Sequence, residues 1–591
     1  MKSTEPEERR AAAAVAAGMQ PADVILSGGR VLNVHTGLIS RSDVAFAGRR
    51  IAAVGDVEYT RGSETKSEDC SGTYLVPGFI DSHIHLGGSQ LTIQRLAEVV
   101  VPHGTIALST DFYELATIGG LDAVLSELTA AQGTGLEILL SPFVAAVLGI
   151  GAFGNLERFS YDDLEVLLNH EACVELREWN CWANWLPLEG QQRIYELALS
   201  RGLAIGGHLE GLSGANLQAS TALGVRSEHE AVSIGEALER LDNGVTVQIR
   251  GGSAARDFED LVPAITERGA DPRMFAFCTD EQELASIATS GHIDRLIRRA
   301  IRNGIAPIEA IRMATLNAAL SMGVDRNFGS ITPGRVASLV AVEDLATLPI
   351  AMVFADGRLA ARSGQYLLEP SPVGFPAAAR KSVVVDEPVT PADFRFDVPD
   401  GEHEVRVIGV APGKLLTEEL VERLTFTSGV IAEGDLTVIG VTDRHLGGHE
   451  RALGLIRGLG LSRGAVAATV NPGMMNLLTL GANPEDMAIA ARRVVELGGG
   501  IVVALDGRIL AEVALPLYGI ISDAPSSEVV QACLAVEKVI EEDLGCHFEG
   551  LISAAGFACL AVSIPSLKIT SRGLARVSRE APAEAVTFVL E

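Results

Sequence analysis

The sequence predicts an α/β protein built around a (β/α)8 TIM-like barrel, with a small composite β domain from both flanks of the barrel and an additional α/β C-terminal domain. Short apolar runs alternate with amphipathic segments between residues 74 and 335, which is typical of βα units around a parallel sheet. Polar residues follow many of these runs, and β-type segments stand on both sides of the region. At 591 residues the chain is also too long for one ordinary hydrophobic core.

The small β domain is predicted from residues 1–73 and 336–362. The first 20 or so residues read as a short charged, alanine-rich helix or a frayed tail. Short β-type segments separated by glycine-containing turns follow, and similar segments return after residue 336. The segments cover residues 24–26, 30–34, 43–46, 338–342 and 352–359. One sheet assembled from both sides of the barrel region, residues 74–335, is therefore expected.

His83 and His85 follow the apolar run 76–80 and are one residue apart. On an extended strand, residues i and i+2 lie on the same face, so both imidazoles would point into one space. Neutral imidazole suits Zn, Mn, Fe, Ni or Cu, so the pair alone does not identify a metal. Taken alone, the pair is equally consistent with two polar residues at a strand end that bind no metal.

Five further apolar runs of the barrel region end in histidine or carboxylate residues. A single such residue is most often a helix cap or turn residue. In a (β/α)8 barrel, however, the carboxyl ends of all strands meet on one face. The recurrence therefore predicts one shared site. Its members are Asp111 with Glu114, Glu178, His208, His229 and Asp280.

The composition favours a small-molecule substrate. A formal net charge of -29 argues against a nucleic-acid or anionic-membrane partner, because both need a basic face. Seven cysteines without paired spacing are typical of reduced thiols in a cytoplasmic protein. No apolar stretch of about 20 residues predicts a membrane span. Glu5, Glu7 and Glu8 stand where a signal peptide would be basic and apolar, so none is predicted.

Residues 363–394 read as a linker, and residues 395–591 as the C-terminal domain. The linker is rich in proline, serine and alanine, which favours an extended, weakly packed connection. The following region has β-type runs at 403–410, 436–441 and 501–505 and a helical segment at 528–544. Its residues His445 and His449 lie in a polar, glycine-containing loop, which either lines the mouth of the active site or is solvated.

The segment Arg250-Gly251-Gly252-Ser253 is a candidate substrate-contact loop. Its glycines allow close backbone approach, and the guanidinium supplies planar hydrogen-bond donors. A surface turn with a solvated arginine explains the same residues equally well.

The chain resembles the amidohydrolase superfamily and, within it, the adenine deaminase family over nearly its full length. The resemblance is clearest in Pro77-Gly78-Phe79-Ile80-Asp81-Ser82-His83-Ile84-His85. Other matching segments of the barrel region are residues 102–105, 207–214, 226–230, 250–255, 277–280, 291–294 and 311–317. In the C-terminal domain, which ordinary hydrolases of the superfamily lack, residues 461–467, 485–488 and 497–500 match.

The resemblance implies an enzyme that holds two divalent metal ions, Mn, Fe or Zn, with Glu178 as the bridge between them. The implied metal ligands are His83, His85, Glu178, His208, His229 and Asp280. Two such ions can share a water, lower its pKa and present a bridging hydroxide. The implied reaction is adenine plus water to hypoxanthine plus ammonia, and the expected assembly is a homo-oligomer, a dimer or higher.

The chemistry assigns further roles. Asp280 is the candidate shuttle that takes the proton of the attacking water and returns it to the departing amine. Glu114 is the candidate acid for the ring nitrogen, which requires a pKa raised by burial or by neighbouring carboxylates. His229 either binds metal or orients the tetrahedral intermediate. Arg250, Ser253 and His208 are the candidate substrate-binding residues.

Three segments depart from the family pattern. Gly87-Gly88-Ser89 stands in place of Glu-Ser-Ser, Asp111-Phe112-Tyr113-Glu114 in place of Asp-Pro-His-Glu, and residues 471–476 in place of a His-Asp-Ser-His-Asn run. Two alternatives to adenine deamination therefore remain: action on another cyclic amidine or amide, and a non-catalytic ligand-binding barrel. Retention of all four histidines with Glu178 and Asp280 favours an enzyme, because a pure binding protein does not need them.

Overall fold

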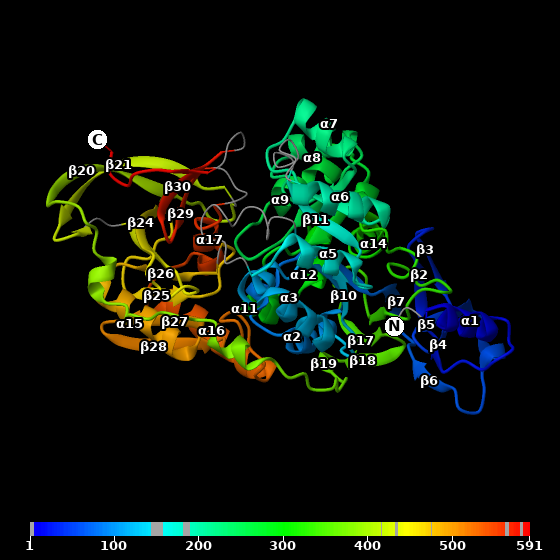
Figure 1. The fold of residues 1–591 in the computed structure, drawn as a ribbon. Helices are drawn as coiled ribbons and strands as arrows, with labels where there is room; N and C mark the ends of the chain where they lie inside the picture. Colours follow the sequence, from blue (N-terminus) through cyan, green and yellow to red (C-terminus); the bar gives the residue numbers. More distant parts are fainter. Residues whose placement is uncertain are drawn as a thin grey trace.

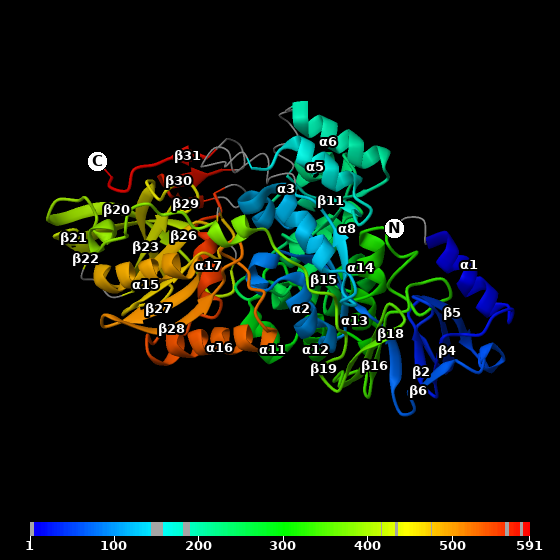
Figure 2. The ribbon, with the colours of Figure 1, turned by 60° about the horizontal axis from the view of Figure 1, so that its bottom comes forward.

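The computed structural model describes residues 5–143, 158–180, 189–414, 416–431, 435–473, 475–561, 566–578 and 583–590. A helix-covered barrel lies in the middle of the molecule (Figure 1). The small β domain lies on one side of the barrel and the C-terminal domain on the other, and a second view shows the same order (Figure 2). The barrel therefore has one neighbouring domain at each side.

Eight parallel strands of the described chain form the barrel. They are β8 (Phe79–Ile84), β9 (Thr105–Thr110), β10 (Glu137–Leu140), β11 (Glu175–Asn180), β12 (Ala204–His208), β13 (Val225–Glu228), β14 (Thr246–Arg250) and β15 (Phe275–Cys278). They pair in chain order within two sheets, β8 to β10 and β11 to β15. Parallel bridges Leu140↔Cys173 and Ile84↔Asp280 join the sheets at both edges. The ring is closed, which confirms the predicted (β/α)8 barrel.

Helices, several of them amphipathic, cover the outside of the barrel. They include α2 (Ile93–Val100), α3 (Tyr113–Ala130), α5 (Tyr161–Asn169), α6 (Glu189–Ser200), α7 (Gly214–Ala222), α8 (Ile234–Asp242), α11 (Leu284–Ser290) and α12 (Ile293–Arg302). Helix α12 shows the pattern well, since Ile293, Leu296, Ile297 and Ala300 are buried on one face. No helix in the described part of the chain combines the length and apolar character needed to cross a membrane.

The small β domain takes strands from both flanks of the barrel, as predicted. One sheet runs in the order β19-β18-β17-β16-β7-β2-β3, and a second in the order β5-β4-β1-β6. The flanks meet where β7 (Tyr74–Pro77) pairs antiparallel with β16 (Leu339–Val342). The other strands are β1 (Val24–Ser27), β2 (Arg30–Asn33), β3 (Leu38–Arg41), β4 (Asp43–Ala47), β5 (Arg50–Gly55), β6 (Lys66–Asp69), β17 (Ile350–Ala355), β18 (Arg358–Arg362) and β19 (Gln365–Tyr366). Helix α1 (Glu5–Ala16) is the charged, alanine-rich helix that was one of the two expected alternatives for the first 20 residues.

The C-terminal domain is a nine-stranded sheet with helices and a small added sheet. The large sheet contains β20 (Gly401–Gly409), β21 (Glu418–Thr427), β22 (Val430–Ile431), β23 (Leu436–Thr442), β24 (Arg451–Arg457), β25 (Ala465–Ala468), β26 (Leu477–Gly481), β27 (Gly500–Leu505) and β28 (Arg508–Ala514). The helices are α15 (Pro484–Leu497), α16 (Ser526–Glu542) and α17 (Leu551–Phe557), and the small sheet contains β29 (Ser566–Thr570), β30 (Gly573–Val577) and β31 (Glu584–Ala585).

The segment 363–394 packs more closely than its composition predicted. Ala379, Val389 and Phe394 are buried, and Val389 and Phe394 belong to a hydrophobic cluster with residues of α15. The expectation of a weakly packed connection is therefore wrong for these residues, because apolar side chains between the prolines bury themselves against the C-terminal domain.

Candidate active site

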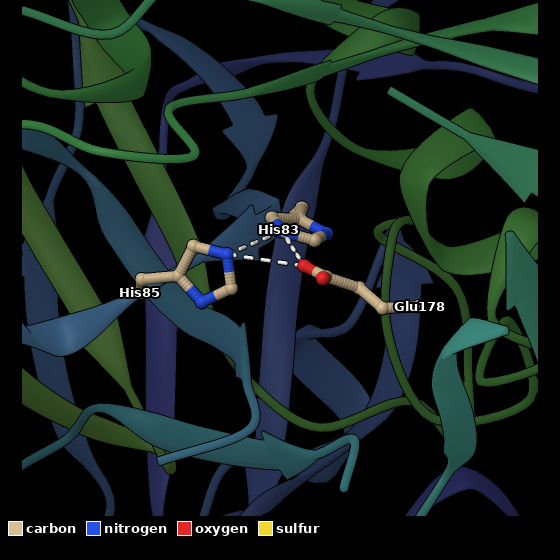
Figure 3. Close-up of side chains that lie close together, drawn as sticks. All are labelled: His83, His85 and Glu178. Atoms are coloured by element: carbon tan, nitrogen blue, oxygen red, sulfur yellow. Dashed lines mark hydrogen bonds and ion pairs between the residues drawn. The ribbon is translucent and has the colours of Figure 1, made fainter. Parts of the chain in front are cut away.

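Ligand atoms from three barrel strands converge at the carboxyl end of β8. The Nε2 atoms of His83 and His85 lie 3.2 Å apart. Oε1 of Glu178 lies 3.2 Å from His83 Nε2 and 3.1 Å from His85 Nε2, so the carboxylate points between the two rings (Figure 3). Oδ1 of Asp280 lies 3.6 and 3.4 Å from the same two nitrogens. Four of the six predicted metal ligands thus share one small space.

The other two predicted ligands adjoin this group. The rings of His83 and His229 have centroids 3.7 Å apart. Nε2 of His229 lies 3.1 Å, and Nε2 of His208 3.6 Å, from Oε1 of Glu230. Sequence reasoning did not single out Glu230, although a carboxylate directly after the strand-end His229 could have signalled it.

The donor set fits a binuclear metal centre. Four groups of side chains bring potential ligand atoms within 4.8 Å of one another. They are His83 with His85 and Glu178, His83 with His229 and Asp280, His208 with His229 and Glu230, and His85 with Asp111 and Glu114. Oε1 of Glu178 is buried and makes no hydrogen bond of acceptable geometry with the two imidazole nitrogens beside it, which is unfavourable for a carboxylate unless a cation neutralises it. The six ligand assignments remain predictions that this geometry supports.

Backbone strain marks the same residues. Glu178 has φ 51° and Asp280 has φ 59°, the left-handed region that non-glycine residues seldom adopt. Such conformations cost about 1–3 kcal/mol and cluster at functional sites. The backbone of Asp280 is held on both sides, since its N–H donates to His83 O at 2.8 Å and its carbonyl accepts from His85 N at 2.7 Å.

Arg250 lies beneath the site rather than in it. Its side chain is fully buried, and Nη1 donates to Glu230 Oε1 at 2.9 Å and to Asp280 Oδ2 at 3.1 Å, while Nη2 donates to Asp257 Oδ2 at 2.8 Å. These carboxylates, distant in sequence, enclose the guanidinium, which disfavours the predicted substrate contact. The predicted contact by Ser253 is disfavoured as well: its hydroxyl accepts from Glu283 N at 2.9 Å, and the residue lines a different cavity.

Glu114 has the properties that the predicted acid requires. It stands in the first turn of α3, is buried and lines the pocket. Burial raises the pKa of Glu114 to about 7, and the nearby Asp111 adds to the increase against the opposing effect of His85. Oε1 accepts from Gly87 N at 3.0 Å, whereas the buried Oε2 has no hydrogen-bond partner. A proton on Oε2 could therefore be donated to a bound molecule.

The pocket lies between the barrel and the C-terminal domain. Its barrel side carries polar groups: His85, Glu114, Glu178, His208, His229, Glu230, Asp280 and Glu281. Its C-terminal side carries mainly apolar ones: Val470, Pro472, Met475, Ile520, Phe557, Cys559, Leu560 and Ala561. His445 and His449 do not line it, which disfavours the first of the two readings of their loop.

The three departures from the family pattern face this pocket. Gly87, Tyr113 and Asn471 all line it, whereas Met474 of the third segment lies outside the described residues. The hydroxyl of Tyr113 donates to Pro472 O at 2.7 Å and so ties the barrel to the C-terminal domain. A side chain at Gly87 would bring its Cβ within 2.8 Å of Glu114 Oε1. The departures therefore all change the lining of one cavity.

A closed (β/α)8 barrel with histidines and carboxylates gathered at the carboxyl ends of its strands defines the protein as an amidohydrolase, a hydrolase acting on carbon–nitrogen bonds. The Amidohydrolase family model matches residues 188–360, and the Adenine deaminase C-terminal domain model matches residues 414–581. Adenine deaminase from Moorella thermoacetica is 35% identical over 587 residues, covering 96% of each chain. Adenine deaminase from Cereibacter sphaeroides is 38% identical, covering 95% of this chain and 97% of its own length. The chain belongs to the adenine deaminase family.

Proposed function

We propose that this protein catalyses the hydrolytic deamination of adenine to hypoxanthine and ammonia. Family membership over nearly the whole chain supports the reaction class. The observation that carries the proposal is the placement of Glu114, a buried carboxyl with a pKa of about 7, in the cavity that His85 and Glu178 of the ligand cluster also line.

The six predicted ligands would hold two divalent ions, Mn, Fe or Zn. When bound, such ions lower the pKa of water and supply hydroxide near neutral pH. The protein positions the ligands for this task. His85 Nδ1 lies 3.1 Å from Asp111 Oδ2, a contact that fixes the orientation of the ring.

The carboxylates move the protons. Arg250 binds Oδ2 of Asp280, which leaves Oδ1 facing His83 and His85 to take the proton of the attacking water. Oε2 of Glu114 donates to the ring nitrogen next to the carbon under attack, because negative charge develops there. Asp280 then returns its proton to the amino group, which leaves as ammonia; the ring carbon keeps the oxygen, and the second proton of the water replaces the one that Glu114 donated.

Another purine-sized cyclic amidine is the second candidate substrate. Gly87, Tyr113 and Asn471 line the pocket and differ from the family pattern, so the difference falls where a substrate's substituents would lie. The Tyr113 hydroxyl already donates to Pro472 O, which sets the shape of this wall.

Ammonia release by protein loaded with Mn, Fe or Zn tests the proposal. We expect the highest kcat/KM with adenine in a panel that includes guanine, pterins and cyclic amides. A higher value for another amidine would favour the second candidate. Fewer than about one metal ion per chain after loading, with no ammonia from any compound, would contradict both, because a water-activating site must be occupied to work.

A further inference from the structure

A second cavity lies between the barrel and the C-terminal domain, and some of its lining residues, such as Ser253 and Glu283, are close in sequence to Arg250 and Asp280. Helices α11 and α12 contribute one wall, and α16 with residues 546–552 contributes the facing wall. Helices α11 and α16 lie side by side in both views of the ribbon (Figures 1 and 2). The volume of about 750 Å³ lies within the range of roughly 300–1,000 Å³ that small-molecule sites occupy.

The α12 wall is cationic. Arg295, Arg298, Arg299 and Arg302 all line the cavity, and their spacing of three and four residues places them along one stripe of the helix. Like charges at this spacing destabilise a helix. The chain has 76 acidic residues and only 47 basic ones, so a stripe of four arginines is unusual for it. A favourable interaction with an anion would offset the repulsion.

Two of these arginines form no ion pair in the described part of the chain. Arg298 pairs with Asp294 and Arg299 with Glu259. Within the described residues, Arg295 and Arg302 make no ion pair with a carboxylate, and Nε of Arg295 is buried without a hydrogen-bond partner. The pKa of Arg295 is lowered to about 10, chiefly by burial. The neighbouring Arg299 and Arg256 lower it as well, and Glu281 offsets only part of their effect. An incoming anion would relieve this crowding of positive charge.

The facing wall presents acceptors. Glu537 and Glu541 of α16 line the cavity together with Glu283, and the walls already meet in one ion pair between Arg256 and Glu549. Burial and the neighbouring carboxylates raise the pKa of Glu537 to about 7. Carboxyl groups in this setting suit the hydroxyl donors of a ligand better than a second anion.

We propose that this cavity binds a sugar phosphate or nucleotide, with its phosphate on Arg295 and Arg302 and its sugar hydroxyls on Glu537 and Glu541. Arginine is well suited to phosphate because its planar guanidinium gives two parallel, charge-assisted hydrogen bonds. The opposite charges of the two walls match the anionic and hydroxylated ends of such a ligand.

Hydrogen bonds link the residues that line this cavity to residues that line the active-site pocket. The carboxylate of Glu281, which lines the active-site pocket, accepts from the backbone N–H of Ser253, which lines the second cavity, at 3.1 Å. Conversely, Glu283 lines the second cavity, and its carboxylate accepts at 2.7 Å from the hydroxyl of Ser553, which lines the active-site pocket. Binding in the second cavity is therefore expected to change the kinetics of the first.

Calorimetric titration of the metal-loaded, full-length protein with ribose 5-phosphate tests the proposal. Ribose, inorganic phosphate and uridine monophosphate serve as comparison ligands that separate the sugar, the phosphate and the base. We expect ribose 5-phosphate to bind at least about tenfold more tightly than phosphate, and ribose not to bind. Arg295→Gln and Arg302→Gln should each weaken binding by about tenfold, since each removes a charge-assisted contact. Exposed Arg268, outside the cavity, provides the control Arg268→Gln, which should bind normally.

Three results would overturn the proposal. They are no binding of any phosphorylated ligand to the wild-type protein, equal binding by the wild-type protein and both cavity variants, and equal affinities for phosphate and ribose 5-phosphate. An anion that binds the metal centre instead would bind with the same affinity to the wild-type protein and to both arginine variants. Because Arg302 is exposed, Arg302→Gln keeps the test decisive even if Arg295→Gln does not fold. The outcome does not depend on whether adenine is the substrate.

Discussion

The two sides of the active-site pocket differ in kind. The barrel side holds histidines and carboxylates at strand ends, where side chains from distant segments meet. The C-terminal side presents apolar groups such as Met475, Ile520 and Phe557. The first side supplies proton transfer and metal ligands, whereas the second encloses the substrate. Substitutions on the two sides should therefore affect different kinetic constants.

The largest effect is expected for Glu178→Gln. The amide keeps the shape but removes the charge that faces His83 and His85, so metal content and kcat/KM should fall together. Loss of a side chain that hydrogen-bonds to a metal ligand already lowers metal affinity or activity by about 10–100-fold. For the loss of a ligand itself, we expect kcat/KM to fall by at least about 100-fold. Elemental analysis and ammonia release measure both quantities. Half-exposed Glu165 of α5 provides the control Glu165→Gln, which should keep full activity and metal. Full activity with unchanged metal in Glu178→Gln would remove Glu178 as the bridge.

Glu114→Gln should lower kcat by about 10²–10⁴-fold, the usual contribution of a general acid. Metal content should stay near the wild-type value, because the main histidine cluster is untouched. Glu127 of the same helix offers a matched control: burial raises its pKa to about 7 as well, and it accepts a backbone N–H from Ile93, but it does not line the pocket. Glu127→Gln should keep its kcat, and a similar loss in both variants would mean that Glu114 acts through stability.

Phe557→Leu tests the apolar side. Loss of part of the aromatic surface should raise KM by about tenfold and leave kcat and metal content nearly unchanged, since a hydrophobic pocket contact distinguishes ligands on this scale. Steady-state kinetics with adenine separates the two constants. Buried Phe396, elsewhere in the C-terminal domain, gives the control Phe396→Leu. A fall in kcat with unchanged KM would contradict the division of the pocket.

The smallest effect is expected for Tyr113→Phe, at the seam between the two sides. The substitution removes the hydrogen bond to Pro472 O and leaves the ring in place. One such bond contributes about 1 kcal/mol, so kcat/KM should change by about fivefold. A change confined to KM would place Tyr113 with the enclosing side, whereas a change confined to kcat would place it with the catalytic side. Unchanged kinetics for adenine and the other amidines would exclude Tyr113 from specificity.

The barrel side was predictable from sequence because polar residues after apolar runs stand out. His83, His85, Glu178 and Asp280 all follow strand-like segments, and parallel strands end on one face of the barrel. The closed fold and the composite β domain followed from the same alternation. These features could be predicted because they follow from the local sequence pattern and from the known topology of (β/α)8 barrels.

The remaining features depend on contacts that no local pattern encodes. Arg250 sits in a glycine-rich stretch typical of a loop, yet Glu230, Asp257 and Asp280 bury it. The apolar pocket wall has the same residue types as any core, so nothing in its sequence distinguishes it. Phe394 likewise packs in a stretch whose prolines favoured an open connection.

The antiparallel pairing of β7 with β16 has a consequence for biosynthesis. Val76 pairs with Val340, so the two strands at the barrel's entry and exit are held together. On the ribosome, β7 emerges early and presents an unpaired edge until the whole barrel has been translated. The pairing therefore forms late in synthesis. Chains that stop before residue 339 would leave this edge of β7 unpaired, and such an edge is prone to aggregation.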